Sequence, residues 1–388
     1  MIRLLTLLVA LPLLASCTAY GQAQPQAAPR TWYFAVSGDS RDCGDLIMPK
    51  IAHAIAEDRE HPAAFYWHLG DFRRMYGPDC DIVKRTHPDW DCKKRPENEL
   101  GPEEMDHYLD TAWDDFIERQ IHPFSPTPVY LGIGNHELGA DRTRTEFQRK
   151  FQPWLTSGPI HNQRVEEAND HFYSTEGATY YHFVQHGSTD FIYLDNASPD
   201  SFPAAQIQWL EKVLSRDRDD MDIKTIVVGM HAALPFSRQS GHAMDASCQG
   251  LCSGQQVYDL LYRMQMAIKV KDKVLPGKRV YVFTSHSHLF ADRLFETDEH
   301  KGQVLTGWLV GTAGAEQYTE QIQYGYALVA VHPDGTLDVR FQEIGRDSPP
   351  LAAGPEAEPL TAFCFEQNKR PSGDSAFKGT CACGQAQP

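Results

Sequence analysis

The sequence predicts an α/β fold, because apolar strand-like segments alternate along the chain with helix-like segments. The second observation is that five of the strand-like segments end directly at a short polar motif. The motifs are Gly38-Asp39, Gly70-Asp71, Gly134-Asn135-His136-Glu137, Gly229-Met230-His231 and Ser285-His286-Ser287-His288. Open α/β sheets bind ligands outside the carboxyl ends of their strands, so we expect these motifs to share one site.

The elements follow in order along the chain. Strands that lead into the five motifs are expected at residues 31–37, 63–69, 128–132, 223–229 and 279–284. Helices are expected at 46–57, 103–119, 204–216 and 255–270. A hairpin is expected from 179–184 and 189–194, and further strands at 305–310, 324–331 and 336–341, the last two joined by the turn Pro333-Asp334-Gly335.

Two segments interrupt this alternation and are expected to be insertions. Residues 72–101 carry Pro, Gly, Asp and two Cys and are typical of a loop, and residues 140–176 are polar and aromatic with weak periodicity, as in a surface insertion or lid. We therefore expect one domain at 31–345 that contains both insertions. A Cys-containing tail follows at 346–388.

The composition indicates a globular protein and limits its partners. Hydrophobic residues make up 41% of the 388 residues and charged residues 23%, which favours a packed core. The formal net charge of -16 argues against nucleic acid as a stable partner, since phosphate binding depends on Lys and Arg. A small phosphate-ester substrate stays compatible with this charge, because metal ions can supply positive charge locally. The oligomeric state is left open.

The N-terminus predicts export. Arg3 precedes a short apolar stretch at 4–14, which has the length of a signal-peptide core and not of a membrane span. Leu14-Ala15-Ser16-Cys17 resembles the bacterial lipobox, so we expect a signal peptide at 1–17, lipidation of Cys17 and a flexible tether at 18–30. The protein would then be anchored in the cell envelope. The alternative is an ordinary secretory peptide cleaved near Ala19.

The eight cysteines after Cys17 form an even set, which favours disulfides in an exported chain. One possibility is that Cys43, Cys80 and Cys92 connect the loops that follow Asp39 and Asp71. A small zinc site at Cys364, Cys381 and Cys383 is the alternative, although a fourth ligand is not evident.

The ordered motifs resemble the calcineurin-like metallophosphoesterase superfamily, whose usual pattern is D-x-H, G-D, G-N-H-[DE], a single His and G-H-x-H. The resemblance covers roughly residues 31–342. It implies an α/β/β/α sandwich of two mixed sheets flanked by helices. It also implies one or two divalent or trivalent metal ions, for which Mn, Fe or Zn would suit the oxygen and nitrogen donors.

The resemblance assigns the metal ligands by motif position. Asp71 would bridge two ions held about 3.5–4 Å apart, and Asp39 and His288 would serve the first ion. The second ion is assigned to Asn135, His231 and His286. His286 and His288 would share a face of an extended strand, so a turn is needed to aim them at different ions.

His136 and Glu137 complete the Asn135 motif. In the family the residue that corresponds to His136 faces the substrate and either protonates the leaving group or stabilises the transition state. Glu137 would either orient that imidazole by a hydrogen bond or cap the following turn.

One position departs from the family pattern. Arg41 stands where the first motif has a metal-binding His, and Arg stays protonated and cannot be a ligand. Purple acid phosphatases use a Tyr at the position of Arg74, so that solution is absent too. Either His68 or Tyr76 fills the gap, or water fills it, or the protein works with one tightly held metal. We infer that the second site is the tighter one.

Arg41 also has two possible roles of its own. With Arg73 or Arg74 it could clamp a phosphate oxygen of the substrate. Otherwise it would form a salt bridge with Asp42, Asp45 or a ligand carboxylate.

The resemblance implies a metal-dependent phosphoesterase that hydrolyses a phosphomonoester or phosphodiester by in-line attack of a metal-bound hydroxide. The alternative is a degenerate hydrolase retained as a surface binding or scaffold lipoprotein, which the missing first-site His would explain. Retention of His136 favours the enzyme, because binding alone would not require that residue.

Overall fold

The computed structural model of the chain describes residues 30–94, 100–156, 158–169, 178–198, 200–238, 242–370, 381 and 383. The predicted signal peptide, the lipidated Cys17 and the tether up to residue 29 lie outside these residues. Among the helices of the described part, none has the length and apolar character needed to cross a bilayer.

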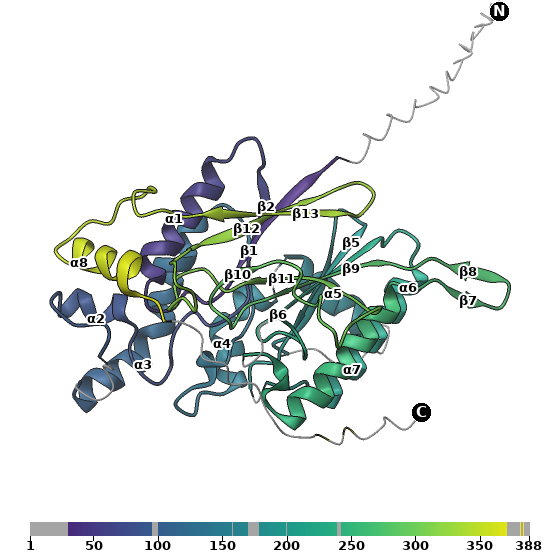
Figure 1. Cartoon of the computed structure of the whole chain (residues 1–388), viewed down its shortest axis with the longest axis horizontal. Coiled ribbons are helices and arrows are strands. Elements are labelled where there is room, and N and C mark those ends of the chain that lie inside the picture. Colours follow the sequence, from purple (N-terminus) through teal and green to yellow (C-terminus); the bar gives the residue numbers. More distant parts are fainter. Residues whose placement is uncertain are drawn as a thin grey trace, which may run out of the picture. The chain divides into compact units, whose positions relative to one another are not determined.

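Two large mixed sheets flanked by helices form the fold, which confirms the predicted class (Figure 1). In the first sheet, β1, β2 and β3 run parallel, and β12 and β13 extend it in antiparallel fashion on the β1 side. Its strands, in spatial order, are β13 (Leu337–Glu343), β12 (Gly325–Val331), β1 (Trp32–Ser37), β2 (Ala63–His68) and β3 (Val129–Leu131).

The second sheet has four parallel strands at its centre, β11, β9, β6 and β5, with an antiparallel strand at each edge. Its order is β10 (Phe290–Ala291), β11 (Thr306–Val310), β9 (Arg279–Thr284), β6 (Thr225–Met230), β5 (Thr189–Leu194) and β4 (Tyr181–Gln185). A separate hairpin of β7 (Ile268–Val270) and β8 (Lys273–Leu275) was not predicted.

The two sheets pack face to face through buried aromatic rings. Phe34 and Phe65 of the first sheet each meet Phe191 of the second sheet edge-on, at ring-centroid distances of 5.0 and 5.1 Å. Trp67 Nε1 donates a hydrogen bond to Tyr181 Oη across the same interface, at 3.0 Å. Burial of this apolar layer is the main force that holds the sheets together.

Helices cover the outer face of each sheet and complete four layers. Helix α1 (Gly44–Glu57) buries Ile47 and Ile51 in a core that also contains residues of β1, β2 and β12. Helices α6 (Ala204–Asp219) and α7 (Cys248–Met264) share a second core with β5, β6 and β9. The arrangement is therefore the α/β/β/α sandwich that the motifs imply.

The two predicted insertions contain more regular structure than expected. Residues 72–101 include α2 (Cys80–Thr86), and α3 (Pro102–Phe116) continues into a π-helical turn at Ile117–Ile121. Residues 140–176 include α4 (Arg144–Leu155) and α5 (Gly158–Asn169), so the prediction of a weakly periodic surface segment was wrong there. Phe147, Phe151 and Leu155 of α4 recur every four residues and are buried in the inter-sheet core.

The C-terminal tail contains α8 (Ala357–Ala362) and is tied to the domain by disulfides. The pairs are Cys43–Cys364, Cys80–Cys92, Cys248–Cys381 and Cys252–Cys383. The zinc alternative was wrong, because all three of its cysteines are paired. The predicted connection between the Asp39 and Asp71 loops was also wrong, since Cys43 pairs with the tail. Disulfides of this kind are typical of an oxidising compartment.

A buried histidine in the second sheet makes stability depend on pH. His182 of β4 lies between Asp190 and Glu167, with its ring nitrogens 2.8 and 3.0 Å from their carboxylate oxygens. Burial opposes the charged form, but the two carboxylates raise the pKa of His182 to about 10. The stabilisation is therefore fully present below the unfolded-state pKa of 6.5 and is lost as pH rises through the folded-state value.

We predict that the free energy of unfolding falls by about 4 kcal/mol between pH 6.5 and 10 because of this group alone. His182→Gln should be less stable at pH 6.5 and should lack this part of the pH dependence. Urea unfolding of both proteins across that range measures the difference. Parallel pH profiles for the two proteins would contradict the assignment.

Candidate metal centre

Parallel strands of both sheets end at the same place and bring the predicted ligands together. Asp39, Asp71 and Asn135 follow β1, β2 and β3, whereas His231 follows β6 and the remaining two histidines follow β9. Ligand atoms of Asp71, His231 and His286 all lie within 4.8 Å of one another. The same holds for Asp39, Asp71 and His288. The two groups therefore share Asp71, as a bridging carboxylate would require.

Each of the two carboxylates has one anchored oxygen and one oxygen that faces the other ligands. Asp71 Oδ1 accepts the backbone N–H of His136 at 2.9 Å, and Asp39 Oδ2 accepts that of His286 at 2.8 Å. Asp71 Oδ2 and Asp39 Oδ1 are buried and accept no hydrogen bond within the described residues. Asp71 Oδ2 lies 3.3 Å from His231 Nε2, and Asp39 Oδ1 lies 3.4 Å from His288 Nε2.

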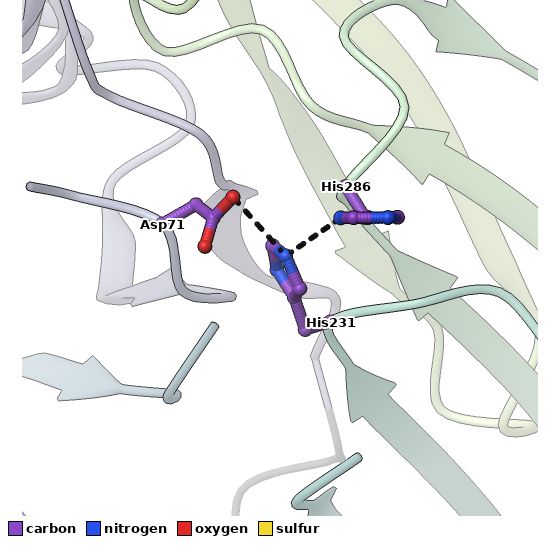
Figure 2. Close-up of side chains that lie close together, drawn as sticks. All are labelled: Asp71, His231 and His286. Carbon is purple, nitrogen blue, oxygen red and sulfur yellow. Dashed lines mark hydrogen bonds and ion pairs between the residues drawn. The ribbon is translucent and has the colours of Figure 1, made fainter. Parts of the chain in front are cut away.

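Figure 2 shows His231 between Asp71 and His286. His231 Nδ1 lies 3.1 Å from the carbonyl oxygen of Leu69, which fixes this nitrogen as the N–H donor. Its Nε2 lies 3.0 Å from Asn135 Oδ1 and 3.1 Å from His286 Nδ1, so this nitrogen faces the other members of the second group. Histidine ligands of metal ions commonly donate their other ring N–H to a backbone carbonyl in this way.

The Ser285-His286-Ser287-His288 turn directs its two histidines toward different ligand groups. On an extended strand they would point to the same side. His286 faces His231, whereas His288 faces Asp39 and donates from Nδ1 to the carbonyl oxygen of Glu316 at 2.6 Å. The backbone of His286 has φ 69°, in the left-handed region. Asp39 and Asp71 have φ values of 60° and 58°. Such strain in non-glycine residues persists only where the surrounding structure enforces it.

Glu137 helps to hold the left-handed backbone of Asp71 in place. Its buried carboxylate accepts the backbone N–H groups of Gly134 and Asp71 at Oε2, at 2.7 and 2.8 Å, and that of Phe72 at Oε1, at 2.9 Å. Glu137 therefore joins the loops after β2 and β3, and these contacts match neither predicted role. The same close approach requires glycine at 134, because a Cβ there would lie 2.2 Å from Asp71 Oδ1.

These residues fit a divalent metal ion. Two buried carboxylate oxygens without hydrogen-bond donors, one amide oxygen and imidazole lone pairs converge, and first-row metals favour such donors. Burial opposes ionisation, yet nearby His and Arg side chains hold the pKa of Asp71 well below its usual range. Burial lowers the pKa of His286 to about 3, which keeps the imidazole neutral. Asp71 raises the pKa of the buried His231 to about 10, so a cation is favoured at its Nε2.

Arg41 extends into the first ligand group. Its Nη2 lies 3.2 Å from His288 Nε2, its Nη1 lies 3.2 Å from His136 Nδ1, and its Nε lies 3.9 Å from Asp71 Oδ2. Of the salt-bridge partners predicted for Arg41, the structure has a ligand carboxylate, that of Asp71. Burial opposes the charge, but Asp71 and Asp42 raise the pKa of Arg41 above its ordinary value. A guanidinium therefore contacts the ligand atoms to which a first metal would bind.

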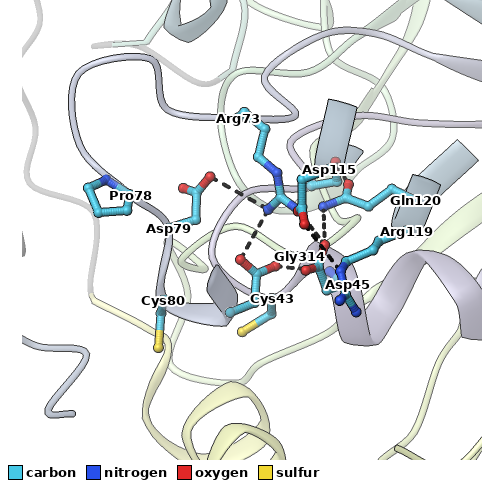
Figure 3. Close-up of polar contacts among 12 residues, drawn as sticks. Cys43, Asp45, Arg73, Pro78, Asp79, Cys80, Asp115, Arg119, Gln120 and Gly314 are labelled. Carbon is cyan, nitrogen blue, oxygen red and sulfur yellow. Dashed lines mark hydrogen bonds and ion pairs between the residues drawn. The ribbon is translucent and has the colours of Figure 1, made fainter. Parts of the chain in front are cut away.

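Arg73 is absent from the site and lies in a separate buried charge cluster, so the prediction that it could clamp phosphate was wrong. Figure 3 shows its guanidinium among aspartates, which include Asp45 and Asp115. Arg73 Nη1 donates to Asp81 Oδ1 at 3.0 Å, and the side chain is fully buried. Four carboxylates fix it there: Asp45, Asp79, Asp81 and Asp115.

His68 does not fill the gap in the first group. Its Nε2 lies 3.0 Å from Ser40 Oγ, and its Nδ1 accepts the backbone N–H of Gly70 at 3.2 Å. Tyr76 packs its ring against His136 at 5.1 Å between centroids, and the side chain is half-exposed. Both ring nitrogens of His68 are therefore used in hydrogen bonds, and the Tyr76 ring packs on His136.

His136 lies beside the ligands, and Arg41 determines its tautomer. Because Arg41 donates to Nδ1, the ring proton of His136 is on Nε2, which lies 3.7 Å from Asp71 Oδ2. Burial and Arg41 lower the pKa of His136 well below its usual value, so the ring is neutral near pH 7. A neutral Nε2–H group can donate a hydrogen bond to a developing negative charge. This favours transition-state stabilisation over proton donation.

Two neighbours of the ligands carry no sequence motif. The ring of Tyr318 stacks on that of His288, with 4.4 Å between the ring centroids. The ring centroids of His242 and His286 are 5.5 Å apart. Both lie several residues beyond the end of a strand, Tyr318 after β11 and His242 after β6, and neither belongs to a recognisable motif, so only the fold identifies them.

No protein-family model and no curated protein matches the chain. Among solved structures, the fold is similar to GAP50, described as the anchor in the inner membrane complex of Plasmodium. The two chains share 11% identity over 90% of this chain and 100% of that chain, with a TM-score of 0.42. At these values the likeness assigns no function.

The buried Arg73 cluster leads to a stability prediction. Arg73→Met should lower the free energy of unfolding by about 3–5 kcal/mol, because it leaves buried carboxylates without their counter-ion. Arg279→Met is the matched control, since Arg279 pairs with Asp334 on the surface, with 43% and 61% of the two side chains exposed. The control should have a much smaller effect. Equal urea midpoints for the two variants would show that the buried cluster is not stabilising.

Proposed function

We propose that the protein is a metal-dependent phosphoesterase that hydrolyses a phosphomonoester or phosphodiester. The observation that carries this proposal is the pair of ligand groups that share Asp71, with His136 and Arg41 beside them. The order of the motifs along the chain supports the same class. A Mn, Fe or Zn ion bound here would neutralise phosphoryl oxygens and activate the attacking water.

One metal ion, held by the second group, is the stoichiometry we propose. Asp71, Asn135, His231 and His286 would hold it. In the first group, Arg41 already donates to His288 Nε2 and lies 3.9 Å from Asp71 Oδ2. A fixed guanidinium there repels a cation and disfavours a second ion. It also supplies the positive charge that the first ion supplies in a two-metal site.

Arg41 and His136 are the groups that we assign to the substrate. Both line a cavity beside the ligands. The guanidinium is held charged by Asp71, so it can bind a phosphoryl oxygen without reorganising. His136 Nε2–H would donate to a phosphoryl or leaving-group oxygen as charge develops there. Both groups act on the transition state, where the negative charge is greatest.

Export is part of the proposal. The four disulfides favour an oxidising compartment. Anchoring through a lipidated Cys17 follows from the lipobox-like tetrapeptide and would hold the enzyme at the bacterial envelope, facing the periplasm or the cell surface.

Asn135 tests the proposal directly. Asn135→Ala should lower the hydrolysis of aryl phosphate monoesters and diesters by about 100-fold or more and should weaken metal retention, because the second group loses a ligand. Asn135→Asp is the matched control, since it keeps an oxygen ligand and should keep the metal. If the wild-type protein reconstituted with Mn, Fe, Zn or Co hydrolyses no ester, the scaffold alternative replaces this proposal.

Arg41 tests the stoichiometry. Purified wild-type protein should contain about one metal ion per chain. Arg41→His removes the guanidinium and offers an imidazole beside Asp39, so its metal content should rise to about two. Arg41→Gln, which removes the charge and adds no imidazole, separates the two effects. Elemental analysis with protein quantified by amino-acid analysis gives the ratios, and a firm value of two for the wild type would refute the single-metal arrangement.

A further inference from the structure

A cationic cavity adjoins the candidate metal centre. It has a volume of about 590 Å³, and His136 and Arg41 form part of its wall. Its cationic side chains are Arg41, Arg74, Lys93, Lys94, Lys369 and Arg370. Two carboxylates, Asp42 and Glu316, also line it. A positive excess here is notable in a chain whose formal net charge is -16.

Several segments that are distant in sequence line this cavity. Arg41 lies in the loop after β1, and Lys93 lies in the segment that follows the Cys80–Cys92 disulfide. Lys369 lies in the tail, which the Cys43–Cys364 disulfide ties to the start of α1. Helices α2 and α8, beside which these segments run, lie at the same end of the domain (Figure 1). Covalent links therefore hold the cationic side chains around one space.

Carboxylates neutralise only part of this charge. Arg370 Nε lies 3.0 Å from Glu316 Oε2, and Arg41 pairs with Asp71. By contrast, Lys369 Nζ donates to the carbonyl oxygen of Glu320 at 2.6 Å. Arg74 donates to the carbonyl oxygens of Gly77 and Pro78, and although burial opposes its charge, Asp42 and Asp79 raise its pKa. A carbonyl oxygen orients a cation without cancelling its charge. The cavity therefore keeps a positive field that extends outward from the metal centre.

Aromatic rings connect the cavity to the catalytic groups. Tyr76 packs against His136, and Tyr318 stacks on His288. Arg370 lies over the Tyr318 ring, 5.0 Å from its centroid, and donates from Nη2 to Tyr318 Oη at 3.2 Å. A molecule whose phosphoryl group contacts Arg41 and His136 would thus extend between these rings toward the lysines.

We infer that the substrate carries a second anionic group, and that this cavity binds it. The inference rests on the proposed phosphoesterase activity and narrows its substrate to a phosphate ester with a further phosphate or comparable anion. Arg41 and His136 would contact the scissile phosphoryl group, while Arg74, Lys93 and Lys369 would face the second anion. A singly charged ester would offer no second anion to Arg74, Lys93 and Lys369.

The test compares fructose 1,6-bisphosphate with fructose 6-phosphate at fixed ionic strength. The wild type should favour the bisphosphate by about tenfold in kcat/KM. The variant Lys93→Gln with Lys369→Gln should raise KM for the bisphosphate about tenfold, leave its kcat unchanged and leave KM for fructose 6-phosphate within about twofold. The matched control is Lys269→Gln with Lys273→Gln, which makes the same charge change on the β7–β8 hairpin at the opposite end of the domain (Figure 1).

The outcomes separate this inference from the proposed function. Hydrolysis of both esters with equal kcat/KM, and with no effect of the cavity variant, would overturn the inference and leave the function standing. If neither ester is hydrolysed, calorimetric titration of fructose 1,6-bisphosphate decides. If the cavity variant binds fructose 1,6-bisphosphate about tenfold more weakly than the control does, the inferred anion site is supported, although the proposed hydrolysis is not. Equal binding in both variants would overturn the inference.

Discussion

The carboxylate of Glu137 is the constraint on which the candidate centre depends. By accepting backbone N–H groups from Gly134, Asp71 and Phe72, it joins the loops that follow two parallel strands. Asp71 can then keep its left-handed backbone and direct a single free oxygen toward both groups of histidines. Three backbone N–H groups of two loops donate to one buried side chain, so the loops cannot separate without leaving buried polar groups unpaired.

The distribution of buried charge explains why two neighbouring arginines differ in role. Arg73 is enclosed by aspartates and has no access to the site, so its charge stabilises the loop after β2. Arg41 meets one ligand carboxylate and two imidazoles, and its guanidinium stays on the wall of the cavity. The surrounding aspartates neutralise the charge of Arg73, whereas the positive charge of Arg41 still acts on a ligand bound beside it.

The order of strands and helices was predictable to a large degree, because alternation of apolar segments is a local signal. The prediction failed at α4, where Phe147, Phe151 and Leu155 recur at helical spacing inside a polar segment. The prediction of the disulfide pairing also failed. Cys43 and Cys364 are separated by 321 residues, and nothing local indicates that the tail returns to the first loop. The cationic cavity was missed for the same reason, since its lysines lie in unrelated segments.

The sequence by itself determined which donor groups stand at the strand ends, because a motif that follows a strand is covalently fixed to it. Within each sheet it also indicated that the strand ends would lie together, since parallel strands share an edge, but the packing of the two sheets brought the two edges together. Only the tertiary structure decided what surrounds those groups: that Glu137 joins two loops, that Arg41 contacts His288 and that Arg73 does not reach the site. These are contacts between side chains of distant segments, and their geometry depends on how both sheets pack.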